Sequence, residues 1–207
     1  MPLSYEKEKE IFRKASLCRA FEQEAFRRVQ DKTIKIPVYL SAGQEYTAAT
    51  LATYLESIDK QIFIQHRGHS TYLSFGGNIE ELVYELLGDT RGCANGMGGS
   101  ASIQCREKQI YGHDGLMGSH VPISTGMCYG NKKLTLCFTG DAAGEEDYSL
   151  TAIGWASTKN LPIWYIVEDN NLSILTEKKV RRNWELQDVA KSMNVSASGL
   201  PDDPLMI

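Results

Sequence analysis

Three features are scarce or missing in this sequence of 207 residues, and each narrows the class of protein. No apolar run approaches the roughly 18 residues that a membrane-spanning helix needs. Positive charge is not in excess, because the net charge is −4, and no basic stripe indicates a nucleic-acid partner. The cysteines are scattered and odd in number, without a C-x-x-C pair, which disfavours a zinc knuckle or a disulfide framework. They are Cys18, Cys93, Cys105, Cys128 and Cys137.

The remaining composition is that of a globular chain, with 42% hydrophobic and 23% charged residues. It predicts a single domain over residues 1–207. The N-terminal stretch "MPLSYEKEKEIF" is charged from the start and lacks the apolar core of a signal peptide. Unpaired cysteines fit a reducing compartment. We therefore expect a cytoplasmic protein that binds neither membrane nor nucleic acid.

The apolar pattern alternates between helices and strands. Helices are predicted over 5–30, the later part of 35–55, 78–89, the second half of 111–130, 146–158 and 183–195. Strands are predicted over 61–65, 134–138 and 162–168, and the last is apolar enough to be covered on both faces. A glycine-rich loop over 91–102 can approach another group closely. Strands and helices at this spacing predict an α/β fold, a parallel sheet flanked by helices.

Polar residues stand where two of these strands end. The stretch "LTLCFTGDAAGEED" (134–147) runs from a strand directly into Asp141, and "DNN" (169–171) follows the next strand, one βαβ unit later. A right-handed crossover places such strand ends side by side, and ligands of parallel sheets bind at this edge. Each motif alone is more often a turn or a helix cap. Their spacing of one βαβ unit favours a shared binding site over two independent turns.

A cation site is the chemistry that this pair favours. The Asp141 carboxylate, the Asn170 amide oxygen and a nearby backbone carbonyl, that of Leu172, are hard oxygen ligands. Mg²⁺ accepts such a set and completes it with phosphate oxygens and water. A helix that begins after Gly144 would point its N-terminus at the same place and favour a phosphate there. The predicted occupant is a magnesium diphosphate.

The sequence resembles a known family at this point. The segment from "GDAAGEED" to "EDNN" looks like the thiamine diphosphate motif, which runs from a GDG triplet to an asparagine pair. More specifically, the chain resembles the alpha subunit of the decarboxylating component of 2-oxo acid dehydrogenases, the pyruvate, branched-chain and acetoin group. Further ordered matches extend over about residues 8 to 200. They are "SAGQE" (41–45), "HRGH" (66–69), "ELLGDTRGCANGMGGS" (85–100), "YGHDGLMGSHVP" (111–122) and "ILTEKKVR" (174–181).

The resemblance implies roles for individual residues. Asp141, Asn170 and the Leu172 carbonyl would ligate Mg²⁺, and His66 and His113 are candidate catalytic residues. Taken singly, each histidine could equally be structural, and Met117 could be core filler. The acids at 145–147 are expected to be helix N-terminal charges. The residues that the resemblance assigns to the cofactor are His66, Arg67, Gly115, Met117, Gly140, Asp141, Ala142, Ala143 and Asn170.

Several features depart from the family pattern. Ala142 replaces the last glycine of GDG, which is harmless only if its φ stays negative. Ser102 stands where the family usually has histidine, and the asparagine pair can be read as 169–170 or 170–171. Family members also continue well past the end of this sequence, through a loop with a catalytic histidine that docks a lipoyl carrier. The chain is thus either a fragment or a short form.

The resemblance implies an enzyme subunit that uses thiamine diphosphate and Mg²⁺. The expected function is the alpha subunit of a 2-oxo acid or acetoin dehydrogenase, sharing its active site with a beta-type, transketolase-like subunit in an α2β2 heterotetramer. Its substrate would be a small 2-oxo acid or ketone, and a lipoyl carrier could accept the product. One alternative is a divergent transketolase-like enzyme without a lipoyl carrier. Another is a non-catalytic cofactor-binding scaffold.

Overall fold

The computed structural model describes residues 4–207, and their contacts divide the chain into two compact units. The charged N-terminal stretch therefore begins outside the described residues. Unit 1 contains Met1–Ile58, His66–Gly112 and Leu200–Ile207, and unit 2 contains Asp59–Gln65 and His113–Gly199. We describe each unit by itself, and the single domain over 1–207 stays a prediction.

Unit 1 is mainly helical. Its longest helix is α1, which the sequence predicted with the same bounds; Ser4 caps it through an oxygen 3.4 Å from the Lys7 N–H. Ile11 and Ala15 of α1 pack with Ala49 of α2 in a buried cluster. Asn78 caps α4, as the sequence predicted, because its side chain accepts from two N–H groups of the first turn. The elements of unit 1 are α1 (Tyr5–Gln30), α2 (Glu45–Tyr54), α3 (His69–Ser74), α4 (Ile79–Leu86) and β2 (Ile110–Tyr111).

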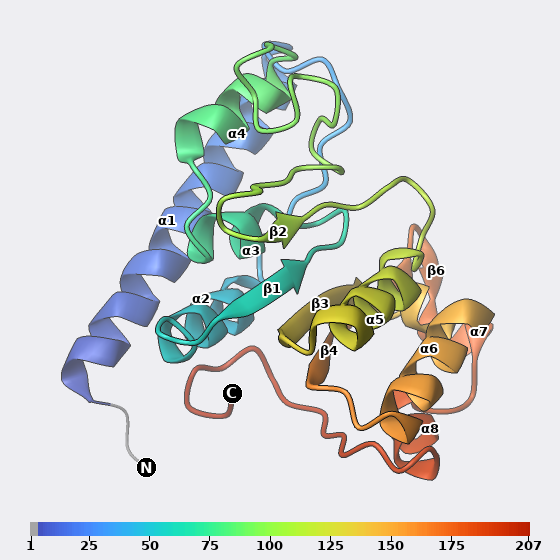
Figure 1. Ribbon diagram of the computed structural model, residues 1–207. Coiled ribbons are helices and arrows are strands. Elements are labelled where there is room, and N and C mark those ends of the chain that lie inside the picture. The colour runs from blue at the N-terminus through green and yellow to red at the C-terminus, as the bar shows by residue number, and fades with distance from the viewer. Residues whose placement is uncertain (1–3) are drawn as a thin grey trace. The chain divides into compact units, whose positions relative to one another are not determined.

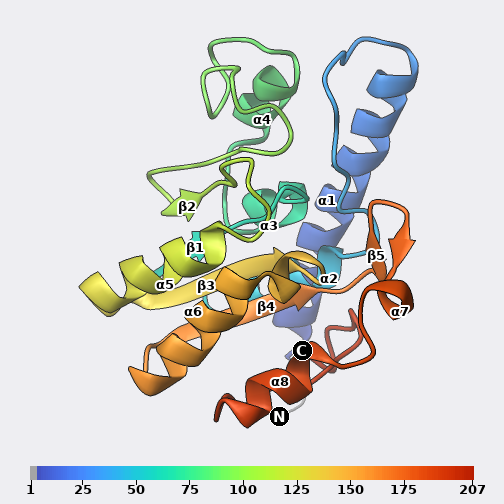
Figure 2. The same ribbon diagram turned by 90° about the vertical axis from the view of Figure 1, so that its right-hand side faces the viewer.

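Unit 2 is built on parallel strands in the order β1-β3-β4. Leu136, Cys137 and Phe138 of β3 are fully buried, because β3 lies between two strands and α5 packs against it. Helix α5 packs against the sheet and α6 lies beside α5 (Figure 2). The elements are β1 (Lys60–Phe63), α5 (His120–Asn131), β3 (Leu134–Gly140), the 3₁₀ turn η1 (Ala143–Glu145), α6 (Asp147–Thr158), β4 (Ile163–Glu168), β5 (Leu172–Ser173), β6 (Thr176–Glu177), α7 (Lys178–Arg181) and α8 (Leu186–Ser192) (Figure 1).

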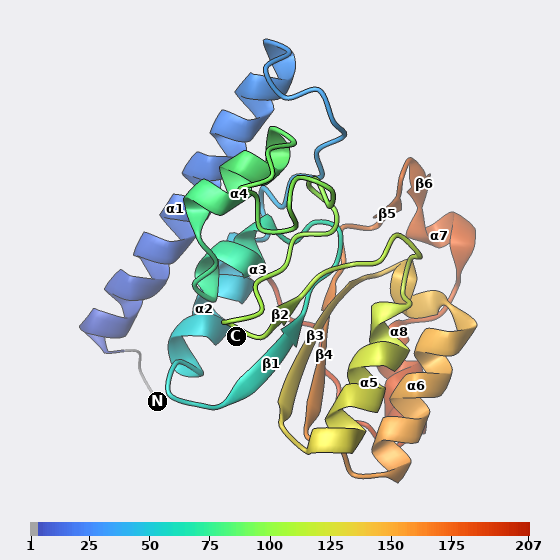
Figure 3. The same cartoon turned by 45° about the horizontal axis from the view of Figure 1, so that its top comes forward.

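The parallel sheet with flanking helices confirms the predicted fold class, but two details of the prediction were wrong and one feature was not predicted. Strand β4 is not covered on both faces: it is the last strand of the sheet, and Trp164 is 48% exposed. The helix predicted over 183–195 is shorter, because α8 spans only Leu186–Ser192. The segment between β4 and α8 forms a hairpin, β5–β6, followed by α7 (Figure 3), which the sequence pattern did not indicate.

No helix within residues 4–207 combines the length and the apolar character that crossing a membrane requires.

Candidate functional site

The two polar motifs of the sequence lie at one edge of the sheet in unit 2. Strands β3 and β4 are parallel and end together, with Gly140 opposite Glu168. The chain continues from these residues into Asp141 on one strand and Asp169 and Asn170 on the other. The predicted neighbourhood of the two motifs is therefore confirmed, because parallel strands send their carboxyl ends to the same edge.

Asp141 is buried, with 1% of its surface exposed, although it is a charged residue. Burying a carboxylate is costly unless a cation or several hydrogen-bond donors compensate the charge. The compensation comes from Arg181, whose Nη2 donates to Asp141 Oδ2 while Nη1 donates to Glu145 Oε1. Arg182 adds a contact of 3.3 Å to the same Glu145. Glu145, expected to be a helix-start charge, is thus an ion-pair partner.

Asn170 is exposed and forms a local turn, in which its Oδ1 accepts from the Leu172 N–H at 3.0 Å. An amide oxygen has a second lone pair, so this bond leaves room for a cation. Asp169 is already engaged by Lys178, whose Nζ lies 2.9 Å from its Oδ2. Burial works to raise the pKa of Asp169, but Lys178 and the Asn171 N–H outweigh it and the pKa is lowered. Asn170 is therefore the more available of the two for a metal.

The backbone at Ala142 shows how an alanine replaces the expected glycine. Its φ is −73° and its ψ is −37°, ordinary helical values that any L-residue adopts. The turn η1 follows from Ala143, and α6 begins only at Asp147. The helix that the sequence placed directly after Gly144 is therefore preceded by this turn.

The segment with Gly115 and Met117 lies against the start of α6. The Tyr148 hydroxyl donates to the Met117 carbonyl, and Ser149 Oγ donates to the Ala143 carbonyl at 2.8 Å. Gly118 has φ +83°, and a Cβ there would come within 2.8 Å of the Ala143 oxygen. This close approach brings the residues predicted for the aminopyrimidine and for the diphosphate together in unit 2.

The histidines fall into two groups. His113 and His120 belong to unit 2, where their rings lie 5.9 Å apart, and burial lowers the pKa of both. His113 Nδ1 accepts from the Gly115 N–H at 3.0 Å, so its neutral ring helps to shape the glycine turn. His66 and Arg67 belong to unit 1, where the His66 ring meets the edge of Tyr39 at 5.2 Å. Their roles toward the cofactor stay predictions.

His69, the second histidine of "HRGH", belongs to a buried hydrogen-bond network in unit 1. His69 Nδ1 lies 3.2 Å from Glu22 Oε1, and Nε2 lies 2.9 Å from Ser100 Oγ. The order Ser, His, Glu has the connectivity of a nucleophile triad. However, Ser100 is 1% exposed and also accepts from the Tyr39 N–H at 2.9 Å. The network ties α1, α3 and the glycine loop together rather than forming an open catalytic centre.

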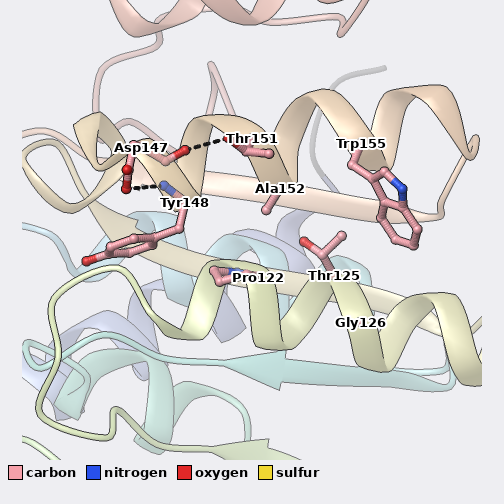
Figure 4. A pocket seen from close by; sticks show the side chains of 8 residues that line it. All are labelled: Pro122, Thr125, Gly126, Asp147, Tyr148, Thr151, Ala152 and Trp155. Carbon is pink, nitrogen blue, oxygen red and sulfur yellow. Dashed lines mark hydrogen bonds between the residues drawn. The ribbon is translucent and has the colours of Figure 1, made fainter.

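A groove of about 620 Å³ runs between α5 and α6 (Figure 4). Tyr148 stands near one end and Trp155 at the other. None of the residues predicted to bind the cofactor lines it. The groove is lined by Pro122, Thr125, Gly126, Asp147, Tyr148, Thr151, Ala152 and Trp155.

Sequence reasoning missed the cations that face the strand ends. Lys178, Arg181 and Arg182 contact Asp169, Asp141 and Glu145. The signal was present, since four of the five residues over 178–182 are basic. Only the fold shows that they lie beside the acids at the strand ends.

These features define an α/β protein whose parallel strands end in a buried carboxylate and an exposed amide, with cations close by. The comparisons with known proteins make the class specific. The family model for the dehydrogenase E1 component matches residues 13–197, and the chain belongs to this family.

Individual relatives agree with this assignment. A mitochondrial pyruvate dehydrogenase E1 alpha subunit of Chaetomium thermophilum is 30% identical over 81% of this chain and 41% of its own length. The pyruvate dehydrogenase E1 alpha subunit of Rhizobium meliloti is 29% identical over 84% of this chain and 51% of its own length. That of Rickettsia prowazekii is 33% identical over 67% and 44%. The chain thus spans about half the length of the curated relatives that it matches.

The family uses thiamine diphosphate with a divalent metal ion, and the strand ends of unit 2 fit this group. Within residues 4–207, no three His, Cys, Asp or Glu side chains gather as a metal site. A metal here would therefore depend on an amide and a carbonyl oxygen beside one carboxylate, which is a donor set for Mg²⁺. Asp141 is buried and carries a cationic partner, the Arg181 guanidinium, on its Oδ2.

Proposed function

We propose that this chain is the alpha subunit of a thiamine diphosphate- and Mg²⁺-dependent 2-oxo acid or acetoin dehydrogenase. The single observation that carries the proposal is the placement of Asp141 and Asn170 at the ends of neighbouring parallel strands, in a chain of the E1 family. The substrate would be a small 2-oxo acid or ketone. A beta-type, transketolase-like subunit would complete the active site in an α2β2 assembly.

In this proposal the residues of unit 2 bind and orient the cofactor. Asp141, Asn170 and the Leu172 carbonyl would hold Mg²⁺, and the Ala142 and Ala143 N–H groups would bind the diphosphate. Gly115 and Met117 hold the aminopyrimidine through backbone groups. Bound thiamine diphosphate supplies the carbon nucleophile that attacks the substrate carbonyl, and the protein positions it.

Titration with thiamine diphosphate and Mg²⁺ tests the cofactor part of the proposal. A ligand that binds only the folded state at a hundredfold excess over its Kd raises the free energy of unfolding by about 2.7 kcal/mol. We expect the cofactor to stabilise wild type in this way, which raises its melting temperature. We expect no such increase for Asp141→Asn. Asp188→Asn removes the same charge from exposed α8 and should respond like wild type. Wild-type protein that binds no cofactor, even with its partner, would favour a non-catalytic scaffold.

A transketolase-like enzyme without a lipoyl carrier is the second candidate. The sequence departures at Ala142 and Ser102 support it. Reduction of a lipoyl domain in the presence of substrate separates the two candidates. A dehydrogenase subunit with its partner should reduce the lipoyl group, whereas a transketolase-like enzyme should transfer its carbon fragment to another acceptor and leave the lipoyl group oxidised.

We also propose a cytoplasmic location. The five cysteines are free in the structure, which suits a reducing compartment. Cell fractionation with an antibody against this chain would test the location directly.

A further inference from the structure

Helix α7 and the residue after it form a basic segment, residues 178–182, beside the acids at the strand ends. Three of its cations make contacts there. Lys178 pairs with Asp169 and Glu185, Arg181 with Asp141 and Glu145, and Arg182 with Glu145. The fourth, Lys179, faces Glu177 and solvent, with 77% of its side chain exposed. Within this segment, Arg181 contacts the predicted metal ligand Asp141, whereas Lys179 contacts none of the predicted site residues.

Arg181 holds the carboxylate that the metal would need. Its guanidinium bridges Asp141 and Glu145, and its side chain is only 14% exposed. Asp141 lies 40 positions earlier in the chain and is buried. An ion pair this shielded from solvent is not screened like a surface pair. Among residues 4–207, Arg181 Nε has no hydrogen-bond partner, while Nη1 and Nη2 donate to the two carboxylates.

Besides the ion pairs of Lys178 and Arg181, little holds helix α7 in place. Helix α7 has four residues, none of them buried, so its release exposes almost no apolar surface. The preceding hairpin turns through Ile174, whose φ of +55° is unusual for a β-branched residue. The Lys178 N–H donates to the Asn171 carbonyl at 2.9 Å, which connects α7 to the loop of Asn170 and Leu172. A displacement of α7 would therefore also move the loop that contains two predicted metal ligands, Asn170 and Leu172.

We propose that Arg181 is the resident counter-ion of Asp141 in the cofactor-free protein and that Mg²⁺ with its diphosphate displaces it. The inference rests on the proposed cofactor site. The Arg181 guanidinium already lies on Asp141 Oδ2, and a second cation bound at the same carboxylate is repelled by it, so the two cations compete. Glu145, which already holds the other side of the guanidinium, retains Arg181 after the exchange. Arg181 thereby weakens cofactor binding while it stabilises the cofactor-free fold.

Replacement of Arg181 should separate these two effects. In Arg181→Gln, we expect a lower melting temperature without cofactor, because Asp141 is left buried and unpaired. We also expect a Kd for magnesium thiamine diphosphate about tenfold lower than that of wild type, because no ion pair has to be broken. Calorimetric titration of the full chain measures the Kd. Mn²⁺ in place of Mg²⁺ gives an independent reading by electron paramagnetic resonance.

Two variants control for charge and for folding. Lys179→Gln removes the same charge from the same helix and should match wild type in melting temperature and Kd. Arg181→Lys keeps the charge but contacts one carboxylate at a time, and should shift the Kd in the same direction by less. If Arg181→Gln does not fold, the Kd of Arg181→Lys still tests the competition.

The outcomes distinguish this inference from the proposed function. If wild type binds the cofactor and the Arg181 variants bind it equally or more weakly, the competition does not exist and Arg181 is inert or a cofactor ligand. If only the Arg181 variants bind, the competition is confirmed in its strongest form. If neither binds, even with the partner present, the cofactor assignment fails and the inference fails with it.

Discussion

A single carboxylate orders the glycine-rich loop of unit 1. Glu85 is completely buried, and its two oxygens accept four backbone N–H groups at 2.7–2.9 Å. The sequence predicted that this loop approaches another group closely, and Glu85 is that group. A Cβ on Gly92 would come within 2.4 Å of its Oε2. The donors are the N–H groups of Ala94, Gly96, Gly98 and Gly99.

Glu85→Gln should destabilise the protein by about 3 kcal/mol or more. The new amide places an NH₂ donor against backbone donors, and buried hydrogen bonds to charged groups contribute about 1.5–3 kcal/mol each. Urea unfolding measures the loss. Glu80→Gln removes the same charge from the exposed first turn of α4 and should cost less than about 1 kcal/mol. Equal losses in both variants would contradict a special role of the buried carboxylate.

His120 makes the stability of unit 2 depend on pH. Burial lowers its pKa from 6.5 to about 4, and the nearby His113 also lowers it, although the bond from Nε2 to the Phe138 carbonyl at 2.9 Å opposes the shift. The unfolded chain therefore binds a proton between pH 6.5 and 4 that the folded chain does not. Stability is fully present above pH 6.5 and falls as the pH drops toward 4.

We expect His120→Gln to flatten the pH dependence of stability in this window. A shift of this size corresponds to about 3 kcal/mol, lost progressively between pH 6.5 and 4 in wild type. Glutamine can still donate to the Phe138 carbonyl but has no proton to gain. Urea unfolding at several pH values gives the two curves. Parallel curves for wild type and variant would show that another group controls the acid transition.

At the scale of elements, α2 takes its cap from a distant part of the chain. Its own N-cap residue, Gln44, makes no side-chain cap bond. Asp202 supplies it instead, because its oxygens accept from the Tyr46 N–H at 3.1 Å and the Thr47 N–H at 2.6 Å. A carboxylate at a helix N-terminus satisfies free N–H groups and complements the helix dipole. The C-terminal segment of unit 1 is thus fastened to an early helix.

Asp202→Ala should therefore lower the free energy of unfolding by about 0.5–2 kcal/mol, the usual cost of a lost cap. It should also increase protease cleavage within residues 200–207. Asp203→Ala is the matched control, because the hydrogen bonds of Asp203 within the described part of the chain are local, to the Leu205 N–H among others. Hydrogen exchange of the first turn of α2 reports on the cap directly, and unchanged exchange would contradict this interpretation.

Two glycines of unit 2 should respond to the same substitution with opposite signs. Gly126 lies inside α5 with open space around its Cβ direction, so Gly126→Ala should stabilise the isolated chain by about 0.5–1 kcal/mol. Gly118 has φ +83° and no room for a Cβ, so Gly118→Ala should destabilise it. Thermal unfolding of both variants checks the signs. A loss of stability in Gly126→Ala would mean that α5 is packed more closely than the structure shows.

At the scale of the whole molecule, the chain spans about half the length of the relatives that it matches. The resemblance implies that a beta-type subunit supplies a glutamate that would activate the aminopyrimidine of the cofactor. We therefore expect no decarboxylation of a 2-oxo acid by the chain alone and activity only after a beta-type partner is added. A coupled assay with separately purified chains checks this. Activity of the chain alone would refute the shared-site proposal.

The sequence by itself determined the fold class and the position of the predicted cation site. The existence of the three parallel strands, the Asn78 cap and the bounds of α1 follow from local periodicity and capping, which depend only on neighbouring residues. Asp141 and Asn170 could be paired because crossover handedness fixes which strand ends meet. The family assignment needed the ordered motifs together, and the family model then confirmed it.

Only the tertiary structure decided which groups compensate the buried charges. Arg181 reaches Asp141 across 40 positions, Glu85 collects the N–H groups of a loop, and Asp202 caps a helix more than 150 positions earlier. No local pattern encodes such pairs, because each depends on where the chain returns after folding. The edge position of β4, with Trp164 exposed, has the same cause: an apolar run shows that a strand forms, not how many neighbours it has.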